Sequence, residues 1–331
     1  MIYLHGIGHF HPENVIDNKF LEDLDIGTNN EWIIERVGIE TRRTVLPLDY
    51  IRETHNQDMR AAYEASLYTN AKSGALAAEK AIAAAGISKE DIGLVIAGGC
   101  TPEYETPAES ATIAGELGLE KPCYDINSAC STFGAHIYNL SMMRPEALPE
   151  YILLVIVENS TRSVDYSDRS AAVLWGDASM AAVVSTRVPG PAQIDFSTLT
   201  SSPAGWDKVV VHRMHHFTQE GKTVQTFAIK RTIRLYREIE EKFGASHDKL
   251  YFISHQANLR MLESVCSRCN IPDDLHLYNV DKFGNTGATG APTVLNQNWS
   301  KFKPGDAVAL IVVGAGLSWS SMFVEFNELK K

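Results

Sequence analysis

Short apolar runs alternate along the chain with segments of helical periodicity. The runs are rich in branched residues, which is typical of strands buried on both faces. They predict strands over 2–8, 92–98, 151–157, 180–185, 194–199, 250–254, 307–313 and 321–326. The periodic segments predict helices over 72–85, 108–117, 130–143, 228–243 and 258–269. Buried strands separated by helices indicate an α/β protein.

Two segments of the chain, 86–97 and 244–254, are similar to each other. Each begins with a glycine that can end a helix, continues through a serine that can cap a turn, and ends in an apolar strand. The chain has 331 residues, which is long for a single hydrophobic core. We therefore expect a duplicated α/β unit, with one half over 1–187 and the other over 188–331.

The composition, with 44% hydrophobic and 21% charged residues, indicates an ordinary globular protein. No apolar run approaches the roughly 18 residues that would indicate a membrane span. The N-terminus lacks an export signal, and the five scattered cysteines favour reduced thiols, so we expect a cytoplasmic protein. The formal net charge of −11 argues against nucleic acid as a partner. Cys266 and Cys269 form a lone CxxC pattern with no second ligand pair, so no metal site is expected.

Cys130 stands in a run of small residues, 125–136, where the chain changes from strand-like to helix-like. A thiol at the start of a helix faces unpaired N–H groups and the helix dipole, which favour the nucleophilic thiolate. Free cysteines are also often simply buried. His255 and Asn285 decide between these interpretations, because each follows an apolar run in a setting of small residues. Together the three residues indicate acyl transfer through a covalent intermediate.

Six segments carry a family resemblance that extends from residue 2 to about residue 326. They are 31–39, the run around Cys130, 168–169 with 175–177, 255–260, 284–286 and 314–319. In these segments the chain resembles the β-ketoacyl-ACP synthase III family, where ACP is acyl carrier protein. The resemblance implies a thiolase-like fold of two mixed five-stranded sheets in five α/β/α/β/α layers, and a homodimer. It implies no cofactor, with acyl-CoA and the phosphopantetheine of ACP as substrates.

The family reaction has two stages, and the resemblance assigns residues to both. Cys130 would first attack an acyl thioester, carried by CoA or ACP, to give an acyl-enzyme. Malonyl-ACP would then lose CO₂, and the resulting enolate would attack that thioester. His255 and Asn285 suit the negative charge that develops on the malonyl thioester oxygen, since both can donate hydrogen bonds. The backbone N–H groups of Cys130 and Ala315 would hold the acyl thioester oxygen.

Residues outside this centre are matched by the same resemblance. Trp32, Arg36, Arg162 and Asn258 match positions that bind CoA or pantetheine. Thr106 matches a position on the wall of the acyl pocket, which often reaches across the dimer. Because threonine is small where a bulky aromatic would close the pocket, we expect acyl groups longer than acetyl to be accepted.

A basic stripe is predicted on the 228–243 helix. Lys230, Arg234 and Arg237 lie at helical spacing, and Arg260 and Arg268 follow the His255 segment. On an acidic protein such a stripe would attract acidic ACP. The same pattern is typical of a plain solvated helix face.

Departures from the family bear on the substrate. The 44–72 segment is longer than in compact members, and Ala315 stands where a glycine is usual. These features favour an alternative, a pathway-specific ketosynthase or acyltransferase of secondary metabolism that joins an acyl chain to a β-ketoacyl or other unusual partner. A third hypothesis, a catalytically inactive structural partner, is disfavoured by the presence of Cys130, His255 and Asn285.

Overall fold

The computed structural model describes residues 1–213 and 215–328. Its strands are β1 (Ile2–Phe10), β2 (Asn14–Asp17), β3 (Thr41–Thr44), β4 (Ile92–Gly98), β5 (Cys123–Asp125), β6 (Tyr151–Glu158), β7 (Ala178–Ser185), β8 (Ala192–Ser201), β9 (Val209–Val211), β10 (Phe217–Gln219), β11 (Lys249–Ser254), β12 (Asp306–Gly314) and β13 (Ser318–Phe326). Its helices are α1 (Asn18–Asp23), α2 (Asn30–Arg36), α3 (Leu48–Thr54), α4 (Met59–Ala65), α5 (Asn70–Ala85), α6 (Glu109–Leu117), α7 (Thr132–Met142), α8 (Arg169–Ala172), α9 (Gly221–Phe243), α10 (Leu259–Cys269), α11 (Val280–Phe283) and α12 (Gly290–Gln297). Every predicted strand and helix is present, and the largest difference is at α9, which begins at Gly221 rather than at residue 228.

One mixed sheet of nine strands, in the order β11-β12-β13-β8-β1-β7-β6-β4-β5, forms the frame of the molecule. In its N-terminal part β4 is parallel to β5 and β6, and β7 is antiparallel to β6 and β1. In its C-terminal part β11 is parallel to β12, and β13 is antiparallel to β12 and β8. A single parallel bridge from Phe252 of β11 to His276 occupies the place that β5 has in the first part. The two parts repeat one strand order, which supports our proposal of two duplicated halves, 1–187 and 188–331.

The sheet differs from the predicted pair of separate five-stranded sheets in two respects. β1 pairs with β8 through Ile2, Tyr3 and Leu4, so the two parts are continuous. The C-terminal part has four strands and only the His276 bridge in the fifth place. In this fifth place Pro272 lacks an N–H group and the chain turns at 273–275. The pairing with β11 is therefore limited to the bridge between His276 and Phe252.

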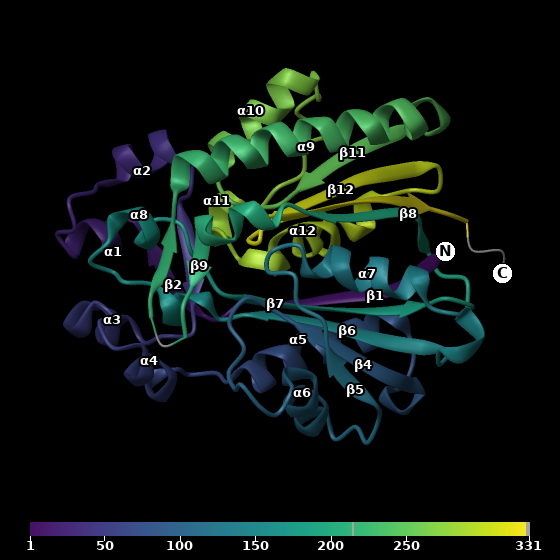
Figure 1. The fold of residues 1–331 in the computed structure, drawn as a ribbon, viewed down its shortest axis with the longest axis horizontal. Coiled ribbons are helices and arrows are strands. Elements are labelled where there is room, and N and C mark those ends of the chain that lie inside the picture. Colours follow the sequence, from purple (N-terminus) through teal and green to yellow (C-terminus); the bar gives the residue numbers. More distant parts are fainter. Residues whose placement is uncertain (214, 329–331) are drawn as a thin grey trace.

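Helices cover the sheet on its outer faces and also lie between its two parts (Figure 1). Strand β6 shows how this buries both faces of a strand. Ile152, Leu154 and Ile156 belong to the central core, which includes residues of α7 and α12 and of strand β12. Leu153, Val155 and Val157 belong to the outer core beneath α5 and α6. Residues of α9 and α10 form a third core on the other side of β12. Burial on both faces explains why these strands appear in the sequence as continuous apolar runs.

Short elements cluster at one end of the molecule, at the left of Figure 1. They comprise α1 to α4, α8 and the two-stranded sheets β2–β3 and β9–β10. The 44–72 segment, which departs from the family pattern, forms α3 and α4 within this group. Its buried Asn56 donates hydrogen bonds to the carbonyl oxygens of Thr161, Arg162 and Val164. The segment is therefore fixed to the N-terminal half rather than lying as a loose insertion.

Candidate active site

Cys130, His255 and Asn285 line one cavity of about 330 Å³, which we call the catalytic cavity. His255 directly follows β11, and Ala315 directly follows β12. Because these neighbouring strands are parallel, both residues lie at the same edge of the sheet, where α/β proteins commonly bind their ligands. Cys130 comes two residues before the first residue of α7. The structure thus brings together residues from three distant parts of the chain.

The backbone around Cys130 is held in a tight turn. Ala129 has a positive φ of 47°, and the N–H groups of Ser131 and Thr132 bond to carbonyl groups of the same turn. The end of β12 passes close to this turn: a Cβ on Gly314 would lie 3.0 Å from the Cys130 nitrogen. Ala315 follows Gly314 and lines the catalytic cavity. The predicted backbone pair, Cys130 and Ala315, therefore lies at the catalytic cavity beside the Cys130 thiol.

The thiol of Cys130 has a second thiol beside it. The Sγ atoms of Cys130 and Cys100 are 4.0 Å apart, and Cys130 is only 8% exposed. The pKa of Cys130 lies well below its usual range, because Cys100 hydrogen bonds to it and His255 lies close to it, and these effects outweigh burial. The pKa of Cys100 is correspondingly raised by the same contact and by burial. The site thus favours a thiolate on Cys130, which is the form that attacks a thioester.

A local hydrogen bond orients the side chain of Asn285, whereas Nδ1 of His255 has no such bond among the described residues. The Oδ1 atom of Asn285 accepts from the N–H of Gly287 at 3.0 Å, so its amide nitrogen is left to donate to a ligand. The backbone of Asn285 is fixed by bonds to Leu174 and Gly176. In His255 the Nδ1 atom is buried and has no hydrogen-bond partner among the described residues, which leaves Nε2 for a ligand. Both residues can therefore present a donor beside Cys130.

The outer part of the catalytic cavity contains three of the four residues predicted to bind CoA or pantetheine: Trp32, Arg36 and Asn258. The Arg36 guanidinium lies 5.8 Å from the Trp32 ring. Asn258 accepts a hydrogen bond from Met261 as the N-cap of α10, so its side-chain oxygen is already occupied. The guanidinium of Arg169, to which the sequence analysis gave no binding role, lies 4.8 Å from the centroid of the same Trp32 ring. A flat aromatic ring with two guanidinium groups is suited to a nucleotide.

Arg162 does not join this group. It is 1% exposed, and its guanidinium donates to Ser66, Asn70 and the carbonyl oxygen of Tyr68. It lines neither the catalytic cavity nor the larger cavity described below. These internal bonds leave it no access to a phosphate, so the structure does not support the predicted contact with CoA.

The residues of the predicted basic stripe lie on the surface, but several charges already have partners. Lys230, Arg234 and Arg237 are exposed on α9. Arg234 forms an ion pair with Glu238, and Arg260 forms one with Glu263. Arg268 is exposed near the end of α10. The stripe exists as a surface feature, and its role in binding ACP stays a prediction.

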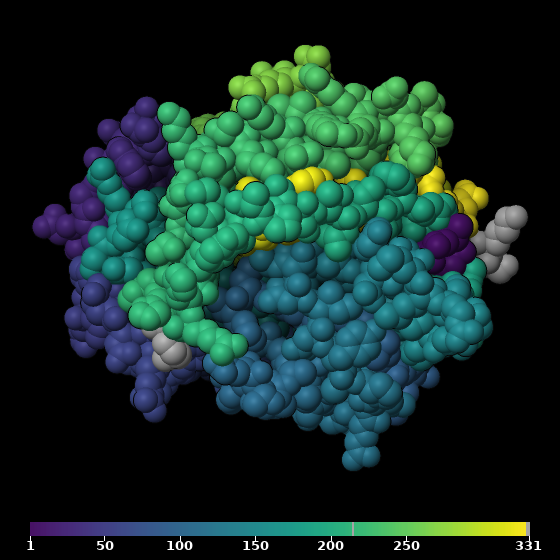
Figure 2. All heavy atoms as spheres, viewed as in Figure 1, coloured from purple at the N-terminus to yellow at the C-terminus, as the bar shows by residue number. Residues whose placement is uncertain are grey.

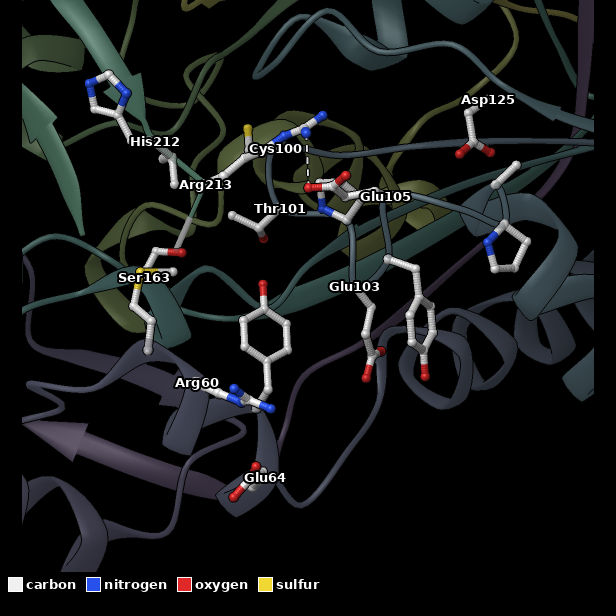
Figure 3. Close-up of a pocket in the computed structure, with 17 residues that line it drawn as sticks. Arg60, Glu64, Cys100, Thr101, Glu103, Glu105, Asp125, Ser163, His212 and Arg213 are labelled. Carbon is white, nitrogen blue, oxygen red and sulfur yellow. Dashed lines mark ion pairs between the residues drawn. The ribbon is translucent and has the colours of Figure 1, made fainter. Parts of the chain in front are cut away.

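A second cavity of about 580 Å³ lies on the far side of Cys100 (Figure 3). It is lined by Cys100, Thr101 and Tyr63, and an ion pair between Arg213 and Glu105 lies at its exposed rim. Figure 2 shows the surface hollowed where the green segment overlies the blue segment. Thr106 is exposed and lines neither cavity of this single chain. The wall position predicted for Thr106 is therefore not reached within one chain.

The sequence analysis missed Glu158 and Cys100. Glu158 is the last residue of β6 and is fully buried. It accepts hydrogen bonds from the N–H groups of Cys100 and Ala288 at 3.1 Å. Burial raises the pKa of Glu158 to about 7, and the charge of Cys130 adds to this shift. The sequence held one signal for Glu158, which is a charged residue at the end of the long apolar run of β6.

Other findings bear on ligands. Cys266 and Cys269 are buried in α10. Over residues 1–213 and 215–328 no group of three or more His, Cys, Asp or Glu side chains is arranged to hold a metal ion. Within the same residues no helix is long and apolar enough to cross a membrane.

Comparison with known proteins gives the same fold and chemistry. The family model for the 3-oxoacyl-[acyl-carrier-protein (ACP)] synthase III C terminal matches residues 240–326, and the model for 3-oxoacyl-[acyl-carrier-protein (ACP)] synthase III matches residues 124–202. The β-ketoacyl-[acyl-carrier-protein] synthase III of Coxiella burnetii is 30% identical over 339 residues, which cover 97% of this chain and 98% of that protein.

Solved structures are similar over nearly the whole chain. The 3-oxoacyl-[acyl-carrier-protein] synthase III of Aquifex aeolicus has a TM-score of 0.85 and 26% identity, covering 98% of this chain and all of that one. A priming β-ketosynthase of a polyketide biosynthetic pathway has a TM-score of 0.82 and 25% identity, covering 99% of this chain and 96% of that one. The fold is therefore thiolase-like, and the chain belongs to the β-ketoacyl-ACP synthase III family of condensing acyltransferases.

Proposed function

We propose that the chain transfers an acyl group from acyl-CoA to Cys130 and then condenses it with malonyl-ACP to give a β-ketoacyl-ACP. The observation that carries this proposal is the meeting of Cys130, His255 and Asn285 in one cavity. A thiolate beside two hydrogen-bond donors fits both stages. The first stage needs a nucleophile, and the second needs donors for an enolate oxygen.

In the first stage the Cys130 thiolate attacks the carbonyl carbon of the thioester. The new carbon–sulfur bond forms as the bond to the sulfur of CoA breaks, and CoA leaves as a thiolate that takes a proton. After the new bond forms and before the bond to CoA breaks, the carbonyl oxygen carries a negative charge. The N–H groups of Cys130 and Ala315 are the proposed donors to this oxygen. Division into two steps makes each one easier than a direct condensation.

In the second stage malonyl-ACP loses CO₂. The electron pair of the broken carbon–carbon bond passes to the thioester oxygen, which gives an enolate. The amide nitrogen of Asn285 and Nε2 of His255 are the proposed donors to that oxygen. The enolate carbon then attacks the acyl group on Cys130, and the thiolate is released for another cycle. One well-placed donor typically contributes about 3–4 kcal/mol to such a step.

Intact mass spectrometry tests this function. The protein is incubated with a panel of acyl-CoA and acyl-ACP donors, and the mass of one acyl group on Cys130 is expected. Addition of malonyl-ACP should remove the label and give β-ketoacyl-ACP and CO₂. If malonyl-ACP releases no CO₂ and the label is removed only by a β-ketoacyl-ACP, the result would support the alternative, a ketosynthase of secondary metabolism. No acylation with any donor would contradict both.

Trp32→Ala is expected to raise KM for acyl-CoA about five- to tenfold and to leave kcat within about twofold, since the ring contributes about 1 kcal/mol or more to binding. The effect should be absent with acyl-ACP as the donor, because ACP presents no adenine. Trp206→Ala is a matched control, since Trp206 is 66% exposed and lines neither cavity. An equal effect with both donors would exclude a nucleotide contact.

We also propose that the second cavity takes the acyl chain of the acyl-enzyme and that the chain forms a homodimer. Two observations support the place of the acyl chain: Cys100 lines the second cavity, and its sulfur lies 4.0 Å from that of Cys130. The short distance gives an acyl group on Cys130 a path past Cys100. In a dimer the exposed Thr106 would meet a partner subunit.

Thr101→Phe should shift the preferred acyl group towards shorter chains, because Thr101 is buried at the wall of the second cavity. Each methylene that no longer fits costs about 0.8 kcal/mol, about fourfold in kcat/KM. Competition between acetyl-, hexanoyl- and decanoyl-CoA for Cys130 measures the shift. Thr106→Phe should have the same effect only if a partner subunit brings Thr106 to the cavity. If neither variant changes the preference, the acyl chain lies elsewhere.

A further inference from the structure

Two buried hydroxyl groups line the second cavity, and a plain acyl chain would leave both without a hydrogen bond. They belong to Thr101 and Ser163, which are 7% and 2% exposed. Neither hydroxyl has a hydrogen-bond partner among residues 1–213 and 215–328. Figure 3 shows both hydroxyl oxygens directed into the space below Cys100 in that view. A buried hydroxyl without a partner is costly, so a ligand that supplies the partner gains affinity.

The main chain holds these two residues in place independently of their hydroxyl groups. Thr101 follows β4 and Ser163 follows β6, and these neighbouring parallel strands end at the same edge of the sheet. The amide of Asn70 donates to the carbonyl oxygen of Thr101 at 2.9 Å. The amide of Asn56 donates to the carbonyl oxygens on either side of Ser163 at 2.9 and 2.8 Å. The hydroxyls are therefore positioned and still free to bind a ligand.

The segment that departs from the family pattern, 44–72, helps to build this cavity. Its helix α4 supplies four of the lining residues, which are Met59, Arg60, Tyr63 and Glu64. Its Asn56 fixes the backbone around Ser163, as described above. The lining of the cavity thus depends on the part of the chain that differs from compact family members. The acyl preference of this chain can differ for the same reason.

The acidic residues of the lining are less available than the hydroxyls. Asp125 accepts from the first two N–H groups of α6 at 2.7 and 2.9 Å, and Glu103 accepts from the first N–H of α5 at 2.6 Å. Glu105 is paired with Arg213 at the rim, and the remaining one, Glu64, is exposed. A substrate carboxylate would meet these like charges. A neutral oxygen on the substrate therefore fits the lining better than an anionic group.

We propose that the second cavity selects an acyl group that carries a hydroxyl or carbonyl oxygen along its chain, and that Thr101 and Ser163 bind this oxygen. A hydroxyl side chain can donate and accept, so it suits either kind of oxygen. A site built to bind a polar group discriminates against the analogue that lacks it, because its own polar groups are then left unpaired. The inference rests on the proposed function, since the chain reaches this cavity only when attached to Cys130.

Competition for Cys130 between octanoyl-CoA and its oxygenated analogues tests the proposal. Octanoyl-CoA is mixed in turn with hydroxyoctanoyl-CoA and oxooctanoyl-CoA isomers that differ in the position and configuration of the oxygen. Intact mass spectrometry measures which acyl group the protein carries. At least one oxygenated isomer should be preferred about five- to tenfold in kcat/KM, the usual scale of one or two hydrogen bonds to otherwise unpaired groups.

Two variants assign that preference to the hydroxyls. Thr101→Val and Ser163→Ala should each reduce the preference about fivefold, because each removes one hydrogen bond to the substrate oxygen. Acylation by octanoyl-CoA should be unchanged or faster in both variants, whereas a purely structural role would slow both substrates together. Thr293→Val is the matched control. Thr293 is also buried with an unpartnered hydroxyl among the described residues, but it lines neither cavity, so the preference should be unchanged.

The outcomes separate this inference from the proposed function. Acylation by octanoyl-CoA without a preference for any oxygenated isomer would overturn the inference and leave the acyltransferase intact. A preference for an acyl-CoA with a terminal carboxylate would also overturn it, and would assign the selection to a cation such as Arg60. No acylation with any acyl-CoA or acyl-ACP would contradict the proposed function itself. If a variant fails to fold, the competition in the wild-type protein still decides.

Discussion

Cys130→Ala is expected to leave no acyl-enzyme after incubation with acyl-CoA. The sulfur is the atom that forms the covalent bond, and alanine offers nothing in its place. Condensation should fall to the level without enzyme, because enolate formation alone has no acyl group to attack. Intact mass spectrometry measures the loss directly, as absence of the acyl increment.

Cys123→Ala provides the matched control. Cys123 is a partly exposed thiol on β5 that lines neither cavity, so its loss should leave acylation within about twofold of wild type. A second possible outcome concerns Cys100, whose sulfur lies 4.0 Å from that of Cys130. Stoichiometric acylation of Cys100 in the Cys130→Ala protein would contradict the assignment of Cys130 as the nucleophile.

All the strands of the large sheet except β5 were predicted, because most of them are buried on both faces; β5 has only three residues, and none of them is fully buried. The prediction for β4 matches its bounds, and the other predicted strands differ by a few residues at their ends. The short elements at the left of Figure 1 were not predicted. Strand β3, for example, consists of Thr41, Arg42, Arg43 and Thr44, and has no apolar signal. Its pairing with β2 depends on tertiary contacts, such as the buried Arg42 donating to the carbonyl oxygen of Val173.

The candidate catalytic residues could be predicted because their types and local settings differ from those of structural residues. Cys130 and Asn285 stand among small residues, His255 directly follows the apolar strand β11, and all three line one cavity. The interpretation failed for Arg162, since a sequence does not reveal whether an arginine points to solvent or to internal acceptors. Glu158 was missed for the related reason that only the pairing of β4 and β6 brings it to Cys100.

Asn285→Ala and His255→Ala are expected to separate the two stages of the reaction. Each should still form the acyl-enzyme, because Cys130 and the backbone donors beside it are intact. Each should lose condensation with malonyl-ACP by about 10²- to 10³-fold, the usual effect of removing one donor to a developing oxyanion. The measurements are the acyl increment on Cys130 and the rate of CO₂ release from malonyl-ACP.

The argument for Asn285 depends on its amide nitrogen, which its bond to Gly287 leaves free to donate. Asn279→Ala is a suitable control, because Asn279 is also buried but donates to Gln297 and lines neither cavity. It should destabilise the protein without a selective loss of condensation. If Asn285→Ala blocked acylation as severely as Cys130→Ala, Asn285 would have to act on the acyl-CoA carbonyl, and the enolate would need a different donor. Retained acylation with lost CO₂ release would place the amide on the malonyl thioester oxygen, the one position where negative charge develops only in the second stage.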